Sequence, residues 1–359
     1  MLSCSLYRGT TKERLGCVDI SARFMVMLRP ALYQKPLPLY HSWSQKHNHI
    51  LMMDSSAKSR TYITLSFAAV IAYAAVIEWA WGWDSIVAQW TNWSPAATAF
   101  ALILMFCTYA IRAYRIRDYF RSHGQVNFSE SFRITLMHNL ANNLLPMRSG
   151  EASFPLMMRS SFGLSLSMTT GTLLFFRVLD LFTLLALGSI AWILGLDTSP
   201  VWLMLWALFL CSPILLLPMR SVVSSQILTR LPRKFEELGN SILSGMPDNL
   251  PALVRTLILT WLNWGLKLAV FAWILISFAD LNVVQAITGA TGGELSSVLP
   301  LHAPGGVGTY EAGVVAGAVF SGADLDSSVL AAVNLHLLII LGTLIGGFIA
   351  PLIGSASPE

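Results

Sequence analysis

Two charged residues of opposite sign interrupt one long apolar stretch of this sequence. Residues 164–194 carry no charge apart from Arg177 and Asp180. A charge within the hydrocarbon of a membrane is costly, and such residues usually face a cavity or a partner. The two residues are three positions apart, so they share one helix face and can pair. Two interpretations stay open at this point, a charge pair that serves a function and a purely structural ion pair.

Lys267 is another charge inside hydrocarbon, alone within the apolar stretch 256–279. It has no acid within one helical turn, so its own helix cannot neutralise it. We therefore expect either a distant acidic partner or an anionic ligand. The acids considered as partners are Asp180, Glu151 and Glu311.

Residues 128–160 are only moderately apolar and contain the stretch NNLLPMRSGE, in which Pro146 and Gly150 break a helix. A broken helix inside a membrane is tolerated only against protein or a watery cavity. Arg148 suits bidentate contact with phosphate, although it can instead pair with Glu151, three residues further on. The candidate site residues of this segment are Asn139, Asn143, Arg148 and Glu151.

Residues 282–321 form a similar segment, with the stretch PLHAPGGVGTYEAG at its centre. Glycines ahead of a helix let backbone N–H groups approach an anion, and the helix N-terminus adds positive potential. The stretch is neither a P-loop nor a dinucleotide fingerprint. His302 is a candidate proton-linked residue, with a structural role as the alternative. The candidate site residues are His302, Gly305, Gly306, Gly308 and Glu311.

The elements that hold these residues are predicted to be membrane helices. Of 359 residues, 55% are hydrophobic and 12% charged, and the mean hydropathy is +0.61. A soluble domain carries about 25% charged residues, so the composition excludes a soluble enzyme, a disordered chain and a nucleic-acid-binding domain. A spanning helix needs about 20 apolar residues. The six stretches of this kind are residues 62–81, 96–113, 164–194, 200–219, 256–279 and 328–353.

The positive charges predict the topology. Of the 23 Lys and Arg residues, nine lie in 1–60, seven in 112–163 and five in 220–255. Cytoplasmic loops collect such residues, so these three segments and the N-terminus are expected inside. Segment 128–160 then begins and ends inside and is expected to be a re-entrant helix pair. Segment 282–321 is expected to re-enter from outside, with two short spans as the alternative.

The resulting order is two spans, a re-entrant pair and a span, repeated with opposite orientation. Inverted repeats of this kind are a recurrent transporter architecture. The expected fold is an all-α polytopic membrane protein of about six spanning helices and two re-entrant helix pairs. Residues 58–359 form this membrane domain, and residues 1–57, which are polar and irregular, are expected to be a disordered cytoplasmic tail.

The stretches NNLLPMRSGE and PLHAPGGVGTYEAG, with an Arg and an Asp in the span between them, resemble the flippase-like superfamily. That superfamily is typified by the transmembrane region of lysylphosphatidylglycerol synthases, and the resemblance covers about residues 60–355. It implies a domain that moves a lipid headgroup between leaflets, without lysyl transfer. It also implies that the lipid path is lined by Arg148, Glu151, Arg177, Asp180, Lys267 and Glu311.

The expected function is therefore the flipping of a polar lipid through a charged, hydrated groove in the cell (inner) membrane, with a cytoplasmic N-terminus. The alternatives are a secondary transporter of a small anionic solute and an accessory subunit of a lipid- or glycan-modifying system. An enzyme is not expected, because no HExxH motif or histidine cluster is present. No cofactor, metal or nucleic acid is expected. The expected partner is a phospholipid, aminoacylated lipid, glycolipid or isoprenoid-linked lipid, besides a second copy or a lipid-synthesis enzyme.

Overall fold

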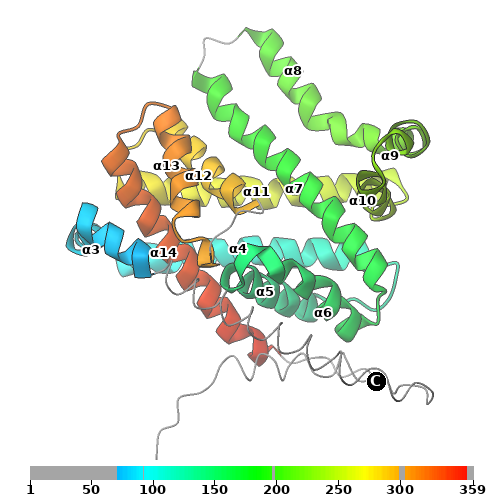
Figure 1. Cartoon of the computed structure of the whole chain (residues 1–359), viewed down its shortest axis with the longest axis horizontal. Coiled ribbons are helices and arrows are strands. Elements are labelled where there is room, and N and C mark those ends of the chain that lie inside the picture. Colours follow the sequence, from blue (N-terminus) through cyan, green and yellow to red (C-terminus); the bar gives the residue numbers. More distant parts are fainter. Residues whose placement is uncertain (1–70, 92, 196–198, 299–303, 354–359) are drawn as a thin grey trace, which may run out of the picture. The chain divides into compact units, whose positions relative to one another are not determined.

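The computed structural model describes residues 71–353, except for residues 92, 196–198 and 299–303 (Figure 1). The described residues form α-helices and short 3-10 or π-helical turns, with no β-strand among them. The all-α fold expected from the sequence is therefore confirmed. The predicted N-terminal tail, residues 1–57, lies outside the described part of the chain.

Five helices of the described chain are long and apolar enough to cross a membrane. They match five of the six predicted spans, and the fold is that of an all-α polytopic membrane protein. The span predicted at residues 62–81 is described only from residue 71, where a shorter apolar helix covers Ile71–Ala80. The five are α4 (Pro95–Phe120), α7 (Leu166–Gly195), α8 (Pro200–Cys211) running through η3 (Ser212–Leu215) into α9 (Leu216–Val222), α11 (Leu250–Phe278) and α14 (Leu325–Ile349).

Capping side chains fix where three of these helices begin. Ser94 accepts a hydrogen bond from the backbone N–H of the first turn of α4, and Pro95 occupies the first helical position. Asn249 caps α11 in the same way. Asp324 caps α14 by accepting from the N–H of Ser327 at 2.9 Å, and this hydrogen bonding lowers the pKa of Asp324.

The first broken segment consists of α5 (Phe128–Leu144), η2 (Pro146–Ala152) and α6 (Ser153–Phe162). Leu145 is extended, with φ −87° and ψ 135°, and Pro146 begins the next turn, so the helix breaks where the sequence predicts. Gly150 then lies directly against α5. A Cβ at Gly150 would be 2.4 Å from the carbonyl carbon of Ala141, so only glycine fits there.

The second broken segment consists of α12 (Val283–Val298), η6 (Pro304–Gly306) and α13 (Thr309–Phe320). Gly305, Gly306 and Gly308 have φ of 68°, 75° and 79°, a conformation that residues with a Cβ rarely adopt. Helices α12 and α13 pack side by side. Both segments are thus helix pairs joined by a break, while their re-entrant insertion and the inverted repeat stay predictions.

Shorter elements connect the long helices. Helix α3 follows Ile71–Ala80, and a run of short turns joins α9 to the amphipathic helix α10. Their bounds are α3 (Trp83–Gln89), η4 (Val223–Ile227), η5 (Leu228–Arg230), α10 (Arg233–Ser244) and η7 (Ala350–Leu352).

Three of the long helices carry a polar stretch between two apolar ones. On α4, the core residues Met105 and Phe120 belong to two separate hydrophobic clusters, and Arg112 and Arg115 lie between them. Helices α7 and α11 likewise contribute to both clusters. Because α11 packs against α4 and α7, the three polar stretches meet. The corresponding residues are Asp180 on α7 and Thr260, Asn263 and Lys267 on α11.

The close packing of α12 on α13 yields a stability prediction. A Cβ at Gly292 would lie 2.2 Å from the carbonyl oxygen of Gly313, so Gly292→Val forces the helices apart. Overpacking of this kind costs about 1–3 kcal/mol. We expect a lower melting temperature of the purified protein in detergent, measured by circular dichroism.

Gly265→Ala is the matched control for this measurement. Gly265 lies in α11, and a Cβ there meets no atom within 4 Å. Alanine is the better helix former by about 1 kcal/mol, so the melting temperature should stay or rise. An equal decrease in melting temperature in the two variants would contradict the close contact of α12 and α13.

Candidate functional site

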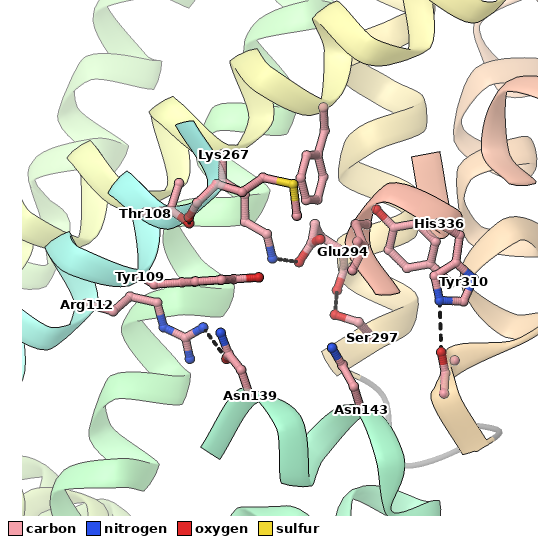
Figure 2. A pocket seen from close by; sticks show the side chains of 15 residues that line it. Thr108, Tyr109, Arg112, Asn139, Asn143, Lys267, Glu294, Ser297, Tyr310 and His336 are labelled. Carbon is pink, nitrogen blue, oxygen red and sulfur yellow. Dashed lines mark hydrogen bonds and ion pairs between the residues drawn. The ribbon is translucent and has the colours of Figure 1, made fainter. Parts of the chain in front are cut away.

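Two adjoining cavities lie where these polar stretches meet, with volumes of about 90 and about 100 Å³. Figure 2 shows side chains from α4, α5, α11, α12, α13 and α14 around the first of them. Because the two cavities share many lining residues, we treat them as one cavity, named here the polar cavity. The shared residues are Thr108, Tyr109, Arg112, Asn139, Asn143, Lys267, Glu294 and Ser297.

Arg112 faces the polar cavity, which corrects the sequence interpretation. The sequence placed Arg112 and Arg115 in a cytoplasmic basic segment that ends the second span. In the structure α4 continues to Phe120, so these two residues lie within the helix, and Arg115 is only 4% exposed. Arg112 donates a hydrogen bond to the amide oxygen of Asn139 at 2.9 Å. The helical spacing of Thr108, Arg112 and Arg115 was the signal that sequence reasoning missed.

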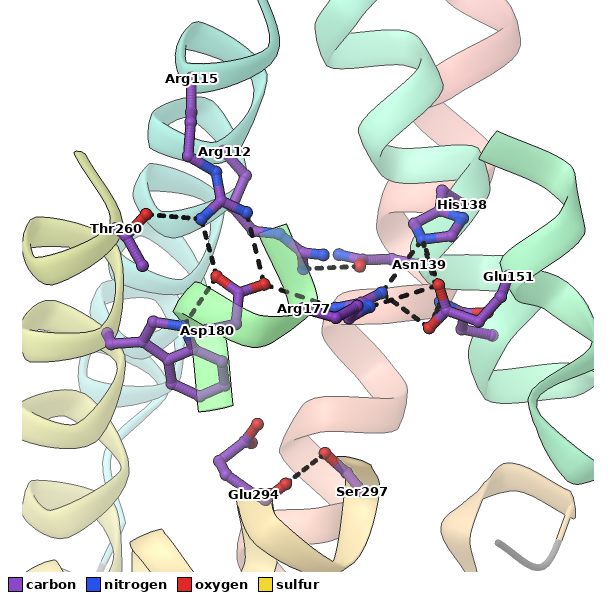
Figure 3. A network of polar contacts seen from close by, with 12 residues as sticks. Arg112, Arg115, His138, Asn139, Glu151, Arg177, Asp180, Thr260, Glu294 and Ser297 are labelled. Atoms are coloured by element: carbon purple, nitrogen blue, oxygen red, sulfur yellow. Dashed lines mark hydrogen bonds and ion pairs between the residues drawn. The ribbon is translucent and has the colours of Figure 1, made fainter. Parts of the chain in front are cut away.

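Asp180 lies at the crossing of α4, α7 and α11 and is 4% exposed (Figure 3). Arg115 pairs with it at 2.7 Å and also donates to the hydroxyl of Thr260 at 2.8 Å. The indole N–H of Trp264 donates to Asp180 at 3.1 Å. Arg177 completes the surroundings at 3.6 Å, so the predicted pairing of Arg177 with Asp180 is present. One buried carboxylate thus joins three membrane helices.

Arg177 also reaches the first broken segment. Its guanidinium lies 2.8 Å from the carboxylate of Glu151 and 3.3 Å from Nε2 of His138. The side-chain amide of Asn142 donates to Nε2 of His138 at 3.1 Å and to Glu151 at 3.3 Å. Arg177 therefore connects Asp180 on its own helix with α5 and η2, as Figure 3 shows.

Lys267 has the distant acidic partner that its isolation predicts, but a different one from those considered. Its ammonium lies 2.6 Å from the carboxylate of Glu294 on α12 and about 5 Å above the rings of Trp264 and Phe271. Glu294 is 4% exposed as a side chain. It is the single charged residue between positions 281 and 310, and that isolation in an apolar stretch was the signal available in the sequence.

Glu311 is not among the residues that line the polar cavity. It bonds instead to the turn at residues 305–308, named here the glycine turn. One carboxylate oxygen accepts from the N–H of Gly308 at 2.8 Å and so caps α13. The other lies 2.8 Å from Nδ1 of His336, which the sequence analysis did not select. The N–H of Gly308, expected to approach an anion, is therefore occupied by the chain's own carboxylate. Gly305 and Gly306 line the cavity as expected.

Four predicted site residues remain. Asn139 and Asn143 both line the polar cavity, and Asn143 donates to the hydroxyl of Thr343 at 2.7 Å. The backbone of Arg148 lies in η2, while its side chain is outside the described part of the structure. His302 also lies outside the described residues. Among described residues, no group of three His, Cys, Asp or Glu side chains is placed to hold a metal.

Fold and site together define a membrane-embedded, all-α protein with a charged cavity between its helices. The family model for the lysylphosphatidylglycerol synthase TM region matches residues 63–347. The chain belongs to this family, which confirms the resemblance seen in the two broken segments. A comparison with curated proteins found no match.

The buried pair of Arg115 and Asp180 generates a second stability prediction. Asp180→Asn leaves the Arg115 guanidinium buried without its counter-charge, and breaking such a pair costs about 3–5 kcal/mol. We expect a strongly reduced melting temperature and a smaller monodisperse fraction on size-exclusion chromatography in detergent.

The control removes an exposed carboxylate that also pairs with arginine. Glu237 bonds Arg233 at 2.8 Å within α10, but their side chains are 64% and 90% exposed. Exposed pairs contribute about 0–1 kcal/mol, so Glu237→Gln should leave the melting temperature nearly unchanged. A mild effect of Asp180→Asn, equal to that of Glu237→Gln, would refute the central role of Asp180.

Proposed function

We propose that the protein moves a polar lipid between membrane leaflets by passing the headgroup through the polar cavity. The observation that carries this proposal is an excess of positive charge among the described side chains around the cavity. Three cations stand against two carboxylates among the residues that line it, which leaves one positive charge. These are Arg112, Arg177 and Lys267 against Asp180 and Glu294.

Arg112 accounts for this excess of positive charge. Arg115 and Arg177 pair with Asp180 and Glu151, and Lys267 pairs with Glu294. Arg112 bonds the neutral amide oxygen of Asn139, and no ion pair of Arg112 is present in the described structure. A guanidinium has five N–H donors, so most of them are left for a ligand. A partly buried cation favours an anionic ligand, because little water is there to solvate it.

The chemistry of the cavity suits a phosphate. A guanidinium binds phosphate oxygens in a bidentate manner, and the neighbouring Asn139 and Ser297 can donate further hydrogen bonds. Glu294, across the cavity, suits an amine or hydroxyl on the same headgroup. Phospholipids, aminoacylated lipids, glycolipids and isoprenoid-linked lipids share this combination of phosphate and polar substituent, and this is the substrate class we propose.

The architecture supports movement of a headgroup rather than its storage. A charge crosses hydrocarbon at lower cost through a polar path than through lipid, and the polar stretches of α4, α7 and α11 supply such a path partway along each helix. We further propose that the two broken segments enter from opposite faces and that the N-terminus is cytoplasmic in the cell membrane. Lipid tails would remain outside, in the bilayer.

The test is leaflet exchange in vesicles with Arg112→Gln as the variant. Purified protein is reconstituted with a panel of fluorescent phospholipids, and reduction by dithionite from outside reports exchange. A hydrogen bond to a charged group contributes about 1.5–3 kcal/mol, so we expect exchange to slow by about tenfold or more. The glutamine keeps hydrogen-bonding capacity toward Asn139 and removes the charge.

Arg117→Gln is the matched control, since Arg117 lies on the same helix but is exposed. It should leave the exchange rate unchanged. Exchange that is equally fast in wild type and Arg112→Gln would contradict the role of Arg112. Anion uptake into the vesicle lumen without lipid exchange would replace the proposal by transport of a small soluble anion.

A further inference from the structure

Two buried histidines of the described chain have opposite hydrogen-bond surroundings. Nε2 of His138 lies within hydrogen-bond distance of two nitrogens that can only donate, from Arg177 at 3.3 Å and Asn142 at 3.1 Å, while a carboxylate oxygen of Glu151 lies further off at 3.7 Å. It therefore accepts with its lone pair. Nδ1 of His138 lies 3.0 Å from the hydroxyl of Ser153 and donates to it. These contacts fit a neutral imidazole.

His336 instead faces an acceptor at each ring nitrogen. Nε2 lies 2.8 Å from the carbonyl oxygen of Gly305, and Nδ1 lies 2.8 Å from a carboxylate oxygen of Glu311. A carbonyl only accepts, so Nε2 carries a hydrogen. A second proton must then lie between Nδ1 and Glu311, on the imidazolium or on the carboxylic acid. In both forms the pair of His336 and Glu311 holds one proton and is neutral as a whole.

The pair is buried, and its carboxylate is hydrogen-bonded by other parts of the chain. His336 is 4% exposed and Glu311 is 6% exposed. The hydroxyl of Tyr73, from the helix Ile71–Ala80, donates to Glu311 at 2.6 Å, and the N–H of Gly308 donates to its other oxygen. Loss of the proton would leave a net negative charge in a buried place, which is costly without a cation in contact.

The cations that line the polar cavity with His336 bond to groups other than the pair of His336 and Glu311. Helices α4, α5, α11 and α13 pack on α14, and α4, α5, α11, α12 and α13 all present polar groups to the cavity that His336 lines. Lys267 pairs with Glu294, and Arg112 bonds Asn139. The ring of Tyr310 lies 4.9 Å from that of His336. The titratable or charged groups around the pair are Tyr73, Tyr109, Arg112, Lys267, Glu294 and Tyr310.

The protonated pair ties α14 to both ends of the glycine turn. His336 holds the carbonyl of Gly305, and Glu311 holds the N–H of Gly308. Gly305 and His336 also line the polar cavity together with Arg112 and Lys267. A headgroup that enters the cavity meets this turn. If moving the turn changes the affinity of the pair for its proton, then the proton changes the position of the turn by the same free energy.

We propose that Glu311 and His336 form a proton-binding site that couples headgroup movement to proton movement. This inference rests on the proposed function and adds the ion that drives it. One proton passes from water to the pair when His336 and Glu311 bond the glycine turn. The proton returns from the pair to water when these bonds to the turn break. No other bond changes, and one proton accompanies each lipid.

The first experiment measures lipid distribution under a pH difference. Vesicles with fluorescent phospholipid receive a difference of one pH unit across the membrane, and dithionite reports the share of lipid in each leaflet. One pH unit corresponds to a tenfold ratio at one proton per lipid. We expect an unequal distribution, up to tenfold, in wild type. With His336→Gln, the distribution reached when exchange is complete should be even under the pH difference, whatever the rate of exchange at equal pH.

His123→Gln is the matched control, because His123 is exposed in the segment between α4 and α5. It should keep the gradient-driven asymmetry. Glu311→Gln is the second test variant and should remove it, as His336→Gln does. If wild type exchanges lipid but ignores the pH difference, the proton proposal is overturned while lipid translocation stands.

A second measurement does not depend on transport. Nitrogen-15 labelling of histidine in nanodiscs reports which ring nitrogens carry protons at neutral pH, and subtraction of the His336→Gln spectrum isolates His336. We expect a protonated Nε2 and a further proton shared between Nδ1 and Glu311. A ring nitrogen with no proton and no bridging proton overturns the proposal. If no lipid exchanges in any vesicle, the proposed function fails, and this spectrum alone decides the proton site.

Discussion

The buried carboxylate of Asp180 is the interaction on which the rest of this structure depends. A charge in a low-dielectric interior needs partners in contact, because desolvation otherwise exceeds any gain. Asp180 obtains them from three helices, through Arg115 on α4, Arg177 on α7 and Trp264 on α11. Since each partner also contacts another group, the position of one helix restrains the others, and a polar layer exists between two apolar clusters.

The two broken segments complete this layer in a similar physical way. Each breaks where proline and glycine interrupt the helix, and at the second break side chains bond the freed backbone groups. At the second break, Glu311 accepts from Gly308, and His336 donates to Gly305. In the hydrocarbon of a membrane such groups have no water to bond. The breaks are therefore structured parts of the cavity wall rather than loose turns.

Charge is distributed unevenly through the polar layer. The carboxylates of Asp180 and Glu294 each pair with a cation, so the charges of these pairs neutralise one another. In the described part of the structure, Arg112 bonds a neutral amide and His336 faces an acceptor at each ring nitrogen. Of the described residues, these two leave a charge or a proton to be shared. They line the same cavity, which connects the proposed anionic ligand with the proposed proton.

The amino-acid sequence alone is enough to predict the membrane class, five of the spans, the two helix breaks and the need of Lys267 for a distant partner. These follow from local composition and spacing, which decide whether a segment is apolar and where a helix can continue. The folded structure was needed to find that Lys267 pairs with Glu294, that Arg112 and Arg115 face inward, and that His336 pairs with Glu311. Partners between 25 and 65 residues apart depend on helix packing, and helix packing is set by contacts that no local pattern contains.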